Sequence, residues 1–111
     1  MKLPSNTLIA PEKLTQYLLI PRRRNDKSRW LAQAGYTIKN WQLLEKDLRK
    51  QILSLAAIPI ENTRYGQMYE IKGNLTGPNG KTLAVCTIWM TETATGDTKF
   101  ITMYPEKGGG K

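Results

Sequence analysis

Three strand-like runs joined by two short turns constrain the fold of this chain most strongly. The runs cover about residues 65–75, 82–91 and 98–104. They are rich in aromatic and β-branched residues, which suit a pleated, half-buried surface. The first turn contains Asn79-Gly80, whose residues tolerate positive φ, and the second contains Gly96. We therefore predict an antiparallel meander, to which residues 58–61 can add a short edge strand because Pro59 needs no hydrogen-bond partner there.

Alternation within these runs predicts which faces of the sheet are buried. The first run alternates apolar and polar side chains, so one of its faces is covered and the other meets water. The middle run is apolar on both faces, with Cys86 opposite Trp89, and should be central. In the third run, alternation places Phe100, Thr102 and Tyr104 on one face. An apolar face needs a second layer, which the N-terminal half must supply.

The N-terminal half predicts three helices, over about residues 11–19, 26–34 and 41–56. Pro11 suits a first helical position. Asn25 or Asp26 can cap the second helix and Gly35 can end it, while Asn40 can cap the third. The third helix carries an apolar stripe of Leu43, Leu44, Leu48, Ile52 and Leu55.

Together these elements predict a single α+β domain over residues 1–105. Its N-terminal helices pack on one face of an antiparallel sheet, a meander of three to four strands, because the stripe of the third helix needs the apolar face of the meander. Residues 106–111 contain three consecutive glycines and are predicted to form a flexible tail. A chain of 111 residues has no length left for a second domain.

The absence of histidine excludes much of the usual catalytic chemistry. Without it there is no Ser-His-Asp triad, no Cys-His pair and almost no zinc site, so we expect no metal and no cofactor. The single cysteine, Cys86, cannot form an internal disulfide and is read as a small core residue. No apolar run is long enough to span a bilayer and no signal-peptide pattern is present. We expect a cytoplasmic protein without membrane contact, although a toxin exported by dedicated machinery would look the same.

Positive charge is concentrated in the N-terminal half. Of the formal net charge of +8, a net of +7 lies in residues 1–58, which hold eleven Lys and Arg against four Asp and Glu. The densest cluster consists of Arg22, Arg23, Arg24, Lys27 and Arg29. Such a field attracts RNA or another polyanion, so these five residues are the candidate nucleic-acid-binding set. The alternative is a solvated loop that only keeps the protein soluble.

Several short motifs, in their order along the chain, resemble a small bacterial domain family that is common in cyanobacteria. The motifs are Lys27-Ser28-Arg29-Trp30-Leu31, Ala34-Gly35-Tyr36, Tyr65-Gly66-Gln67-Met68-Tyr69, Gly77-Pro78-Asn79-Gly80, Thr87-Ile88-Trp89 and Ile101-Thr102-Met103-Tyr104-Pro105. The family in turn resembles, by its helices-then-meander layout, the barnase/EndoU/colicin/RelE-like ribonuclease toxins. This chain departs from the common pattern at Arg22-Arg23-Arg24-Asn25, where a His-containing loop is frequent. If relatives use that histidine, this member is inactive or works differently.

The resemblance implies a ribonuclease that works without histidine, as RelE-like enzymes do with Lys, Arg and Tyr. The candidate catalytic residues are Lys27, Arg29, Tyr65, Tyr69, Thr102 and Tyr104. Lys27 is the candidate base, provided that neighbouring cations help it to release a proton. Arg29 and the three arginines at 22–24 are candidate phosphate clamps, and the tyrosines are candidate acids or stacking platforms. Each also has an ordinary structural interpretation: Lys27 and Arg29 cannot share one helix face, and the tyrosines can simply pack.

Three functions therefore stay open from the sequence. The first is a toxin-type ribonuclease whose basic loop and second helix hold the RNA backbone over the sheet. The second is a module that binds nucleic acid by charge and cleaves nothing. The third is a protein-interaction domain that a small acidic immunity or antitoxin protein would cap. A toxin would also have such a partner, so the third does not exclude the first.

Overall fold

A computed structural model describes residues 1–24 and 26–106 of the chain. The elements follow in the order α1 (Pro11–Lys13), η1 (Leu14–Leu18), α2 (Lys27–Ala32), η2 (Ile38–Asn40), α3 (Trp41–Asp47), η3 (Leu48–Leu53), β1 (Ile58–Thr63), β2 (Gly66–Thr76), β3 (Thr82–Glu92) and β4 (Thr98–Pro105). The strands form one antiparallel sheet in the order β1-β2-β3-β4. The predicted α+β class and meander are confirmed.

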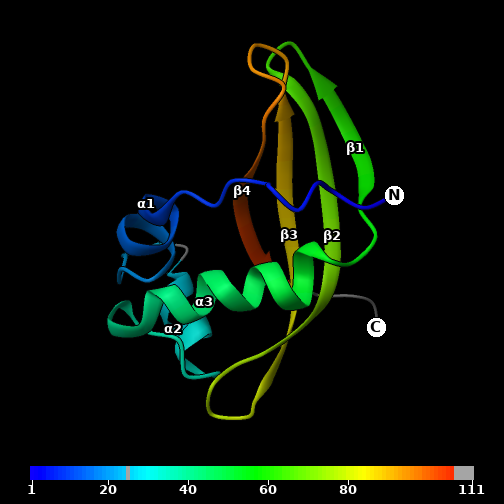
Figure 1. The fold of residues 1–111 in the computed structure, drawn as a ribbon. Coiled ribbons are helices and arrows are strands. Elements are labelled where there is room, and N and C mark those ends of the chain that lie inside the picture. The colour runs from blue at the N-terminus through cyan, green and yellow to red at the C-terminus, as the bar shows by residue number, and fades with distance from the viewer. Residues whose placement is uncertain (25, 107–111) are drawn as a thin grey trace.

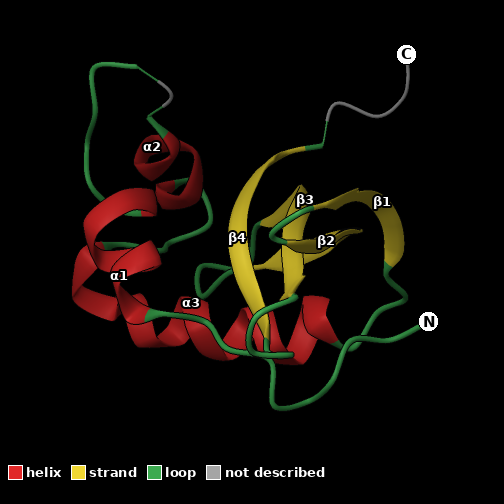
Figure 2. Ribbon diagram, turned by 90° about the horizontal axis from the view of Figure 1, so that it is seen from above, coloured by secondary structure: helices red, strands yellow, loops and turns green. Residues whose placement is uncertain are grey.

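The helices lie on one side of the sheet, and α3 with its continuation η3 crosses the strands there (Figure 1). Seen from above, α1 and α2 lie beside the β4 edge (Figure 2). Leu44, Leu48 and Ile52 are fully buried in the shared core, as predicted. Leu55 is 37% exposed but still covers the sheet, because a Cβ on Gly73 would lie 2.5 Å from its Cδ1.

A β-bulge in β4 corrects the predicted face of Phe100. Thr102 pairs with Ile88, whereas Phe100 pairs with Trp89, and the register shifts between these two pairs. Ile101 is therefore the extra residue of a bulge, and such a residue reverses the alternation of side chains beyond it. Phe100 lies on the helix-covered face, where its ring meets Trp89 edge-to-face at 5.2 Å. Thr102 lies on the open face, so the prediction that Phe100 shares its face was wrong.

The helix ends agree with the predictions in part. Asp26 caps α2, since its carboxylate accepts a hydrogen bond from the Ser28 N–H at 3.0 Å, while Asn25 lies outside the described residues. Gly35 has φ +96° and follows the helix end, as expected for a stop. Asn40 is the N-cap residue of α3, as expected, but its side chain makes no capping hydrogen bond to that helix. It closes a capping box with Thr37 instead, accepting from the Thr37 N–H at 2.7 Å, so a 3₁₀ turn precedes the helix.

Residues at both ends of the described part of the chain contact the sheet. Leu8 lies parallel to β4 beside Lys99, donating its N–H to the Thr98 carbonyl and accepting from the Phe100 N–H, each at 2.8 Å. This N-terminal segment covers the outer edge of β4 as far as Phe100. At the other end, the Glu106 N–H donates to the Ala84 carbonyl at 2.9 Å, so the first residue of the predicted tail extends the sheet. The rest of that tail, 107–111, lies outside the described residues.

Candidate active site

The side chain of Lys27 lies at the meeting point of three elements. It is the first residue of α2, next to the Asp26 cap that fixes the start of this helix. Its Nζ donates to Thr102 Oγ1 of β4 at 3.1 Å and to the Tyr17 hydroxyl of η1 at 3.5 Å. The same ammonium lies 5.4 Å from the centre of the Tyr17 ring and 5.9 Å from that of Tyr104. We call Tyr17, Lys27, Thr102 and Tyr104 the Lys27 cluster.

The two tyrosines of the Lys27 cluster are perturbed in opposite directions. A hydrogen bond with Thr102, together with the charges of Lys27 and Arg22, holds the pKa of Tyr17 below its ordinary value against the opposing effect of burial. Contact with the Cys86 thiol, followed by burial, raises the pKa of Tyr104 to about 12. Environments that push the pKa values of two neighbouring groups apart suit one group to accept a proton and the other to donate one. Tyr17 and Tyr104 form such a pair beside the Lys27 ammonium.

Cys86 and Glu70 form a polar pair next to Tyr104 on the open face of the sheet. Cys86, 1% exposed, pairs with Tyr104 across the strands, and its thiol donates to Glu70 Oε2 at 3.2 Å. Burial raises the pKa of the Cys86 thiol, which therefore stays protonated and is a poor nucleophile. On the same face, Lys72 forms ion pairs with Glu70 at 3.9 Å and Glu106 at 3.1 Å. These residues contact the Lys27 cluster through Cys86, whose thiol lies against Tyr104.

Two hollows flank the Lys27 cluster and share Tyr17. One, of ≈ 520 Å³, is lined by Tyr17, Ile20, Pro21, Arg22, Arg23 and Arg24. Its Arg22 guanidinium lies 5.1 Å from the centre of the Tyr17 ring, so a cation–π contact joins the basic loop to the cluster. The other, of ≈ 570 Å³, lies between η1 and β4 and includes Lys27 and Thr102 in its lining. We call them the arginine hollow and the η1–β4 hollow.

Comparison with known proteins assigns the chain to a family. A model for a domain of unknown function, DUF6883, matches residues 2–107. The chain belongs to this family. No curated protein matches it. Among solved structures, a chain of a "Contact-dependent growth inhibition toxin - immunity protein complex from Klebsiella pneumoniae 342" is similar, with a TM-score of 0.62 and 18% sequence identity over 94% of this chain and 97% of that chain. The DUF6883 domain and that chain share a fold.

The DUF6883 fold brings together only some of the residues that the sequence nominated. Lys27, Thr102 and Tyr104 lie in one cluster. Tyr65 is 62% exposed in the turn between β1 and β2, where the Arg64 guanidinium donates to its hydroxyl at 2.8 Å. Tyr69 pairs with Trp89 and packs against the helix-covered core, on the face opposite Tyr104. The structure thus does not place Tyr65 or Tyr69 in the pocket expected for them.

The five basic residues predicted to bind nucleic acid do not form one continuous site in the DUF6883 domain. Arg22, Arg23 and Arg24 are exposed and line the arginine hollow together, whereas Lys27 lines the η1–β4 hollow. Arg29 lines neither of these two hollows and is exposed on α2. The structure therefore divides the predicted set in three, and the nucleic-acid-binding role of each member stays a prediction.

Lys27 and Arg29 lie on different faces of α2, as expected. In addition, η1 supplies a cluster residue that was not predicted from the sequence. Arg29 is exposed whereas Lys27 is half-buried, so these two residues do not share a helix face, as expected. The missed residue is Tyr17. Its position just before the basic loop was the available signal, because a ring there can reach the cations that follow it.

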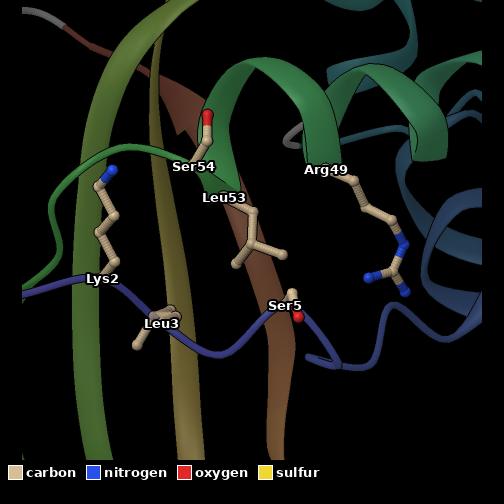
Figure 3. Close-up of a pocket in the computed structure, with 6 residues that line it drawn as sticks. All are labelled: Lys2, Leu3, Ser5, Arg49, Leu53 and Ser54. Carbon is tan, nitrogen blue, oxygen red and sulfur yellow. The ribbon is translucent and has the colours of Figure 1, made fainter.

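A third hollow, of ≈ 340 Å³, lies between the N-terminal segment and η3 (Figure 3). It includes Lys2, Ser5 and Arg49 in its lining, but the Arg49 guanidinium is already engaged: Nη1 donates to the Thr7 carbonyl at 2.8 Å, and Nε faces Glu45 at 3.8 Å. These contacts hold the N-terminal segment onto the helix formed by α3 and η3, so this hollow serves the fold.

Within the described residues, no group of three or more Cys, Asp or Glu side chains lies close enough to hold a metal ion. Over the same part of the chain, none of the helices has the length and apolar character needed to cross a bilayer.

Proposed function

We propose that this domain is a toxin-like endoribonuclease that binds RNA at the Lys27 cluster and cleaves it there. The observation that carries the proposal is the Lys27 ammonium held between the hydroxyls of Tyr17 and Thr102, with the Tyr104 ring beside it and the arginine hollow next to it. A cation among hydroxyls that can exchange protons, at the edge of a strongly basic surface, suits the stabilisation of a phosphate whose charge increases during reaction.

The proposed reaction is an internal transesterification. The ribose 2′-oxygen attacks phosphorus and its proton passes to the Tyr17 phenolate, while the bond from phosphorus to the 5′-oxygen breaks and that oxygen takes a proton from Tyr104. The products are a 2′,3′-cyclic phosphate and a 5′-hydroxyl. A lowered pKa increases the phenolate fraction of Tyr17 at neutral pH, and a pKa of about 12 keeps Tyr104 protonated as a donor.

Lys27 has a different role in this reaction from the one expected from the sequence. Because its Nζ donates to both Tyr17 and Thr102, we assign it as the cation that faces the phosphate and favours the Tyr17 phenolate, rather than as the base. The three arginines at 22–24, in the neighbouring hollow, would bind the flanking phosphates. Arg29 is exposed on α2 and is proposed only to add to the long-range attraction of RNA.

A protein partner follows from the same proposal. The fold neighbour was solved as part of a toxin–immunity protein complex. A nuclease that attacks RNA endangers the cell that makes it, so a small acidic protein covering the Lys27 cluster would be needed there. The formal net charge of +8 supports the toxin role for this chain rather than the immunity role, since an acidic partner complements it.

The test is cleavage of RNA oligonucleotides by purified protein. Lys27→Ala should lower the rate by roughly 10²–10⁴-fold, the range for losing a group that assists proton transfer. Tyr17→Phe should cause a comparable loss. Lys46→Ala removes the same charge from an exposed site on α3 and should leave the rate unchanged.

Two further controls separate the outcomes. A substrate with 2′-deoxyribose at the cleaved position should resist cleavage, because the attacking hydroxyl is absent. If wild-type protein leaves structured and unstructured RNA intact and cells express it without harm, catalysis is refuted. Salt-dependent RNA binding would then leave the non-catalytic binding module as the function.

A further inference from the structure

The η1–β4 hollow differs in chemistry from the arginine hollow on the other side of Tyr17. Ala10 and Ile101 give it apolar walls, and Ile101 is the extra residue of the β4 bulge. Glu12 and Gln16 supply a carboxylate and an amide one helical turn apart on the same side of the helix. Glu12 is exposed and makes no ion pair or side-chain hydrogen bond within the described residues. Its charge is therefore available to a ligand.

The two hollows suit different parts of a nucleotide. Three arginines in one hollow attract phosphate, whereas a carboxylate in the other repels it. A nucleobase is neutral and flat, with N–H donors at its edge, and so fits apolar walls that carry one acceptor. Because Lys27 and Thr102 of the Lys27 cluster also line the η1–β4 hollow, a base placed there would belong to the nucleotide beside the cleaved phosphate.

Building on the proposed function, we propose that the η1–β4 hollow is the base-binding subsite and that Glu12 makes guanine its preferred base. A carboxylate offers two acceptor oxygens. Guanine alone among the four bases presents two adjacent N–H donors, N1–H and the N2 amino group, on its Watson–Crick edge. Cytosine, adenine and uracil each place an acceptor next to their single donor group there, so an acceptor faces one carboxylate oxygen. The Gln16 amide can then donate to guanine O6.

The expected selectivity is moderate. A well-made bidentate contact to a base edge discriminates by roughly tenfold to a hundredfold against the wrong base. Because Glu12 is exposed, water competes for its oxygens, and the lower end of this range is expected. Lys13 also lines the hollow and can offset part of the carboxylate charge without supplying an acceptor.

The direct test is binding of the four nucleoside 3′-monophosphates to isotope-labelled protein, followed by NMR. Guanosine 3′-monophosphate should bind about tenfold more tightly than the others, with shifts at Gln16 and Ile101. Glu12→Gln should abolish this preference, so that guanosine and adenosine 3′-monophosphate bind with equal affinity. Glu61→Gln, an exposed carboxylate on β1, is the matched control and should keep the preference. Equal affinities for all four nucleotides, or shifts that avoid the hollow, would overturn the subsite.

Cleavage of a uridine oligonucleotide carrying a single guanosine separates the subsite from the proposed function. If wild-type protein cleaves only at the guanosine, and Glu12→Gln cleaves without this selectivity, both the subsite and the ribonuclease are supported. Cleavage at every position equally would reject the subsite and keep the ribonuclease. Glu12-dependent guanosine binding without any cleavage would keep the subsite and reject the ribonuclease.

Discussion

Replacing Thr87 by valine should destabilise the domain by about 1–4 kcal/mol, even though the two side chains have nearly the same shape. Thr87 is completely buried. Its Oγ1 donates to the Ile71 carbonyl at 2.9 Å and accepts from Trp89 Nε1 at 2.7 Å. Valine would leave the buried indole N–H without a partner, at a cost of about 1–3 kcal/mol. Loss of the second hydrogen bond adds about 1 kcal/mol, and the extra methyl group recovers less than about 1 kcal/mol.

Thr87→Ser is the matched control because it keeps the hydroxyl and removes only a methyl group. It should cost about 1 kcal/mol. The assay is equilibrium urea unfolding followed by tryptophan fluorescence and far-UV circular dichroism, with the midpoint falling and the slope unchanged. If the valine variant proved as stable as the serine variant, the hydrogen bonds would not be holding Trp89 as argued. The Thr-x-Trp motif of β3 would then need another explanation.

Two further predictions concern charge and pH. Changing Arg22, Arg23 and Arg24 to alanine should weaken RNA binding and flatten its dependence on salt in a fluorescence-anisotropy titration, with little loss of stability, because fewer phosphates are neutralised. The charge-matched control changes three exposed lysines of the helical half, Lys39, Lys46 and Lys50. An equal effect in this control would show that only net charge matters. Separately, burial and the 2.6 Å hydrogen bond to Asp47 raise the pKa of Tyr36, so stability should fall as pH rises above about 10, where the unfolded tyrosine ionises and the folded one does not. Tyr36→Phe should reduce this alkaline loss but not remove it, because the pKa values of Tyr104 and Cys86 are also raised. Thermal unfolding between pH 8 and 11 measures the difference.

The sequence by itself determined the architecture, because hydrophobic period and turn chemistry are local signals. Alternation in β2, the two apolar faces of β3, the glycines of the turns and the stripe of Leu44, Leu48 and Ile52 were sufficient to predict a helical layer on an antiparallel meander. The basic loop was also legible, since charge does not depend on folding. The sequence grouped its neighbour Lys27 with Thr102 and Tyr104, and the structure brings these three side chains together.

Tertiary structure alone decided which other residues meet at the Lys27 cluster. Tyr17 is ten residues from Lys27 in the sequence and 85 from Thr102. It enters the cluster because η1 lies beside β4. Thr102 reaches the open face because one bulge residue, Ile101, reverses the alternation after Phe100. The bulge leaves no local signal, because it follows from how the strand edge meets its neighbours. The basic loop after Tyr17 indicates nearby cations but not the contact with β4. The pKa values of Tyr17 and Tyr104 diverge for the same reason, since each depends on the charges and thiol that folding brings within a few ångströms.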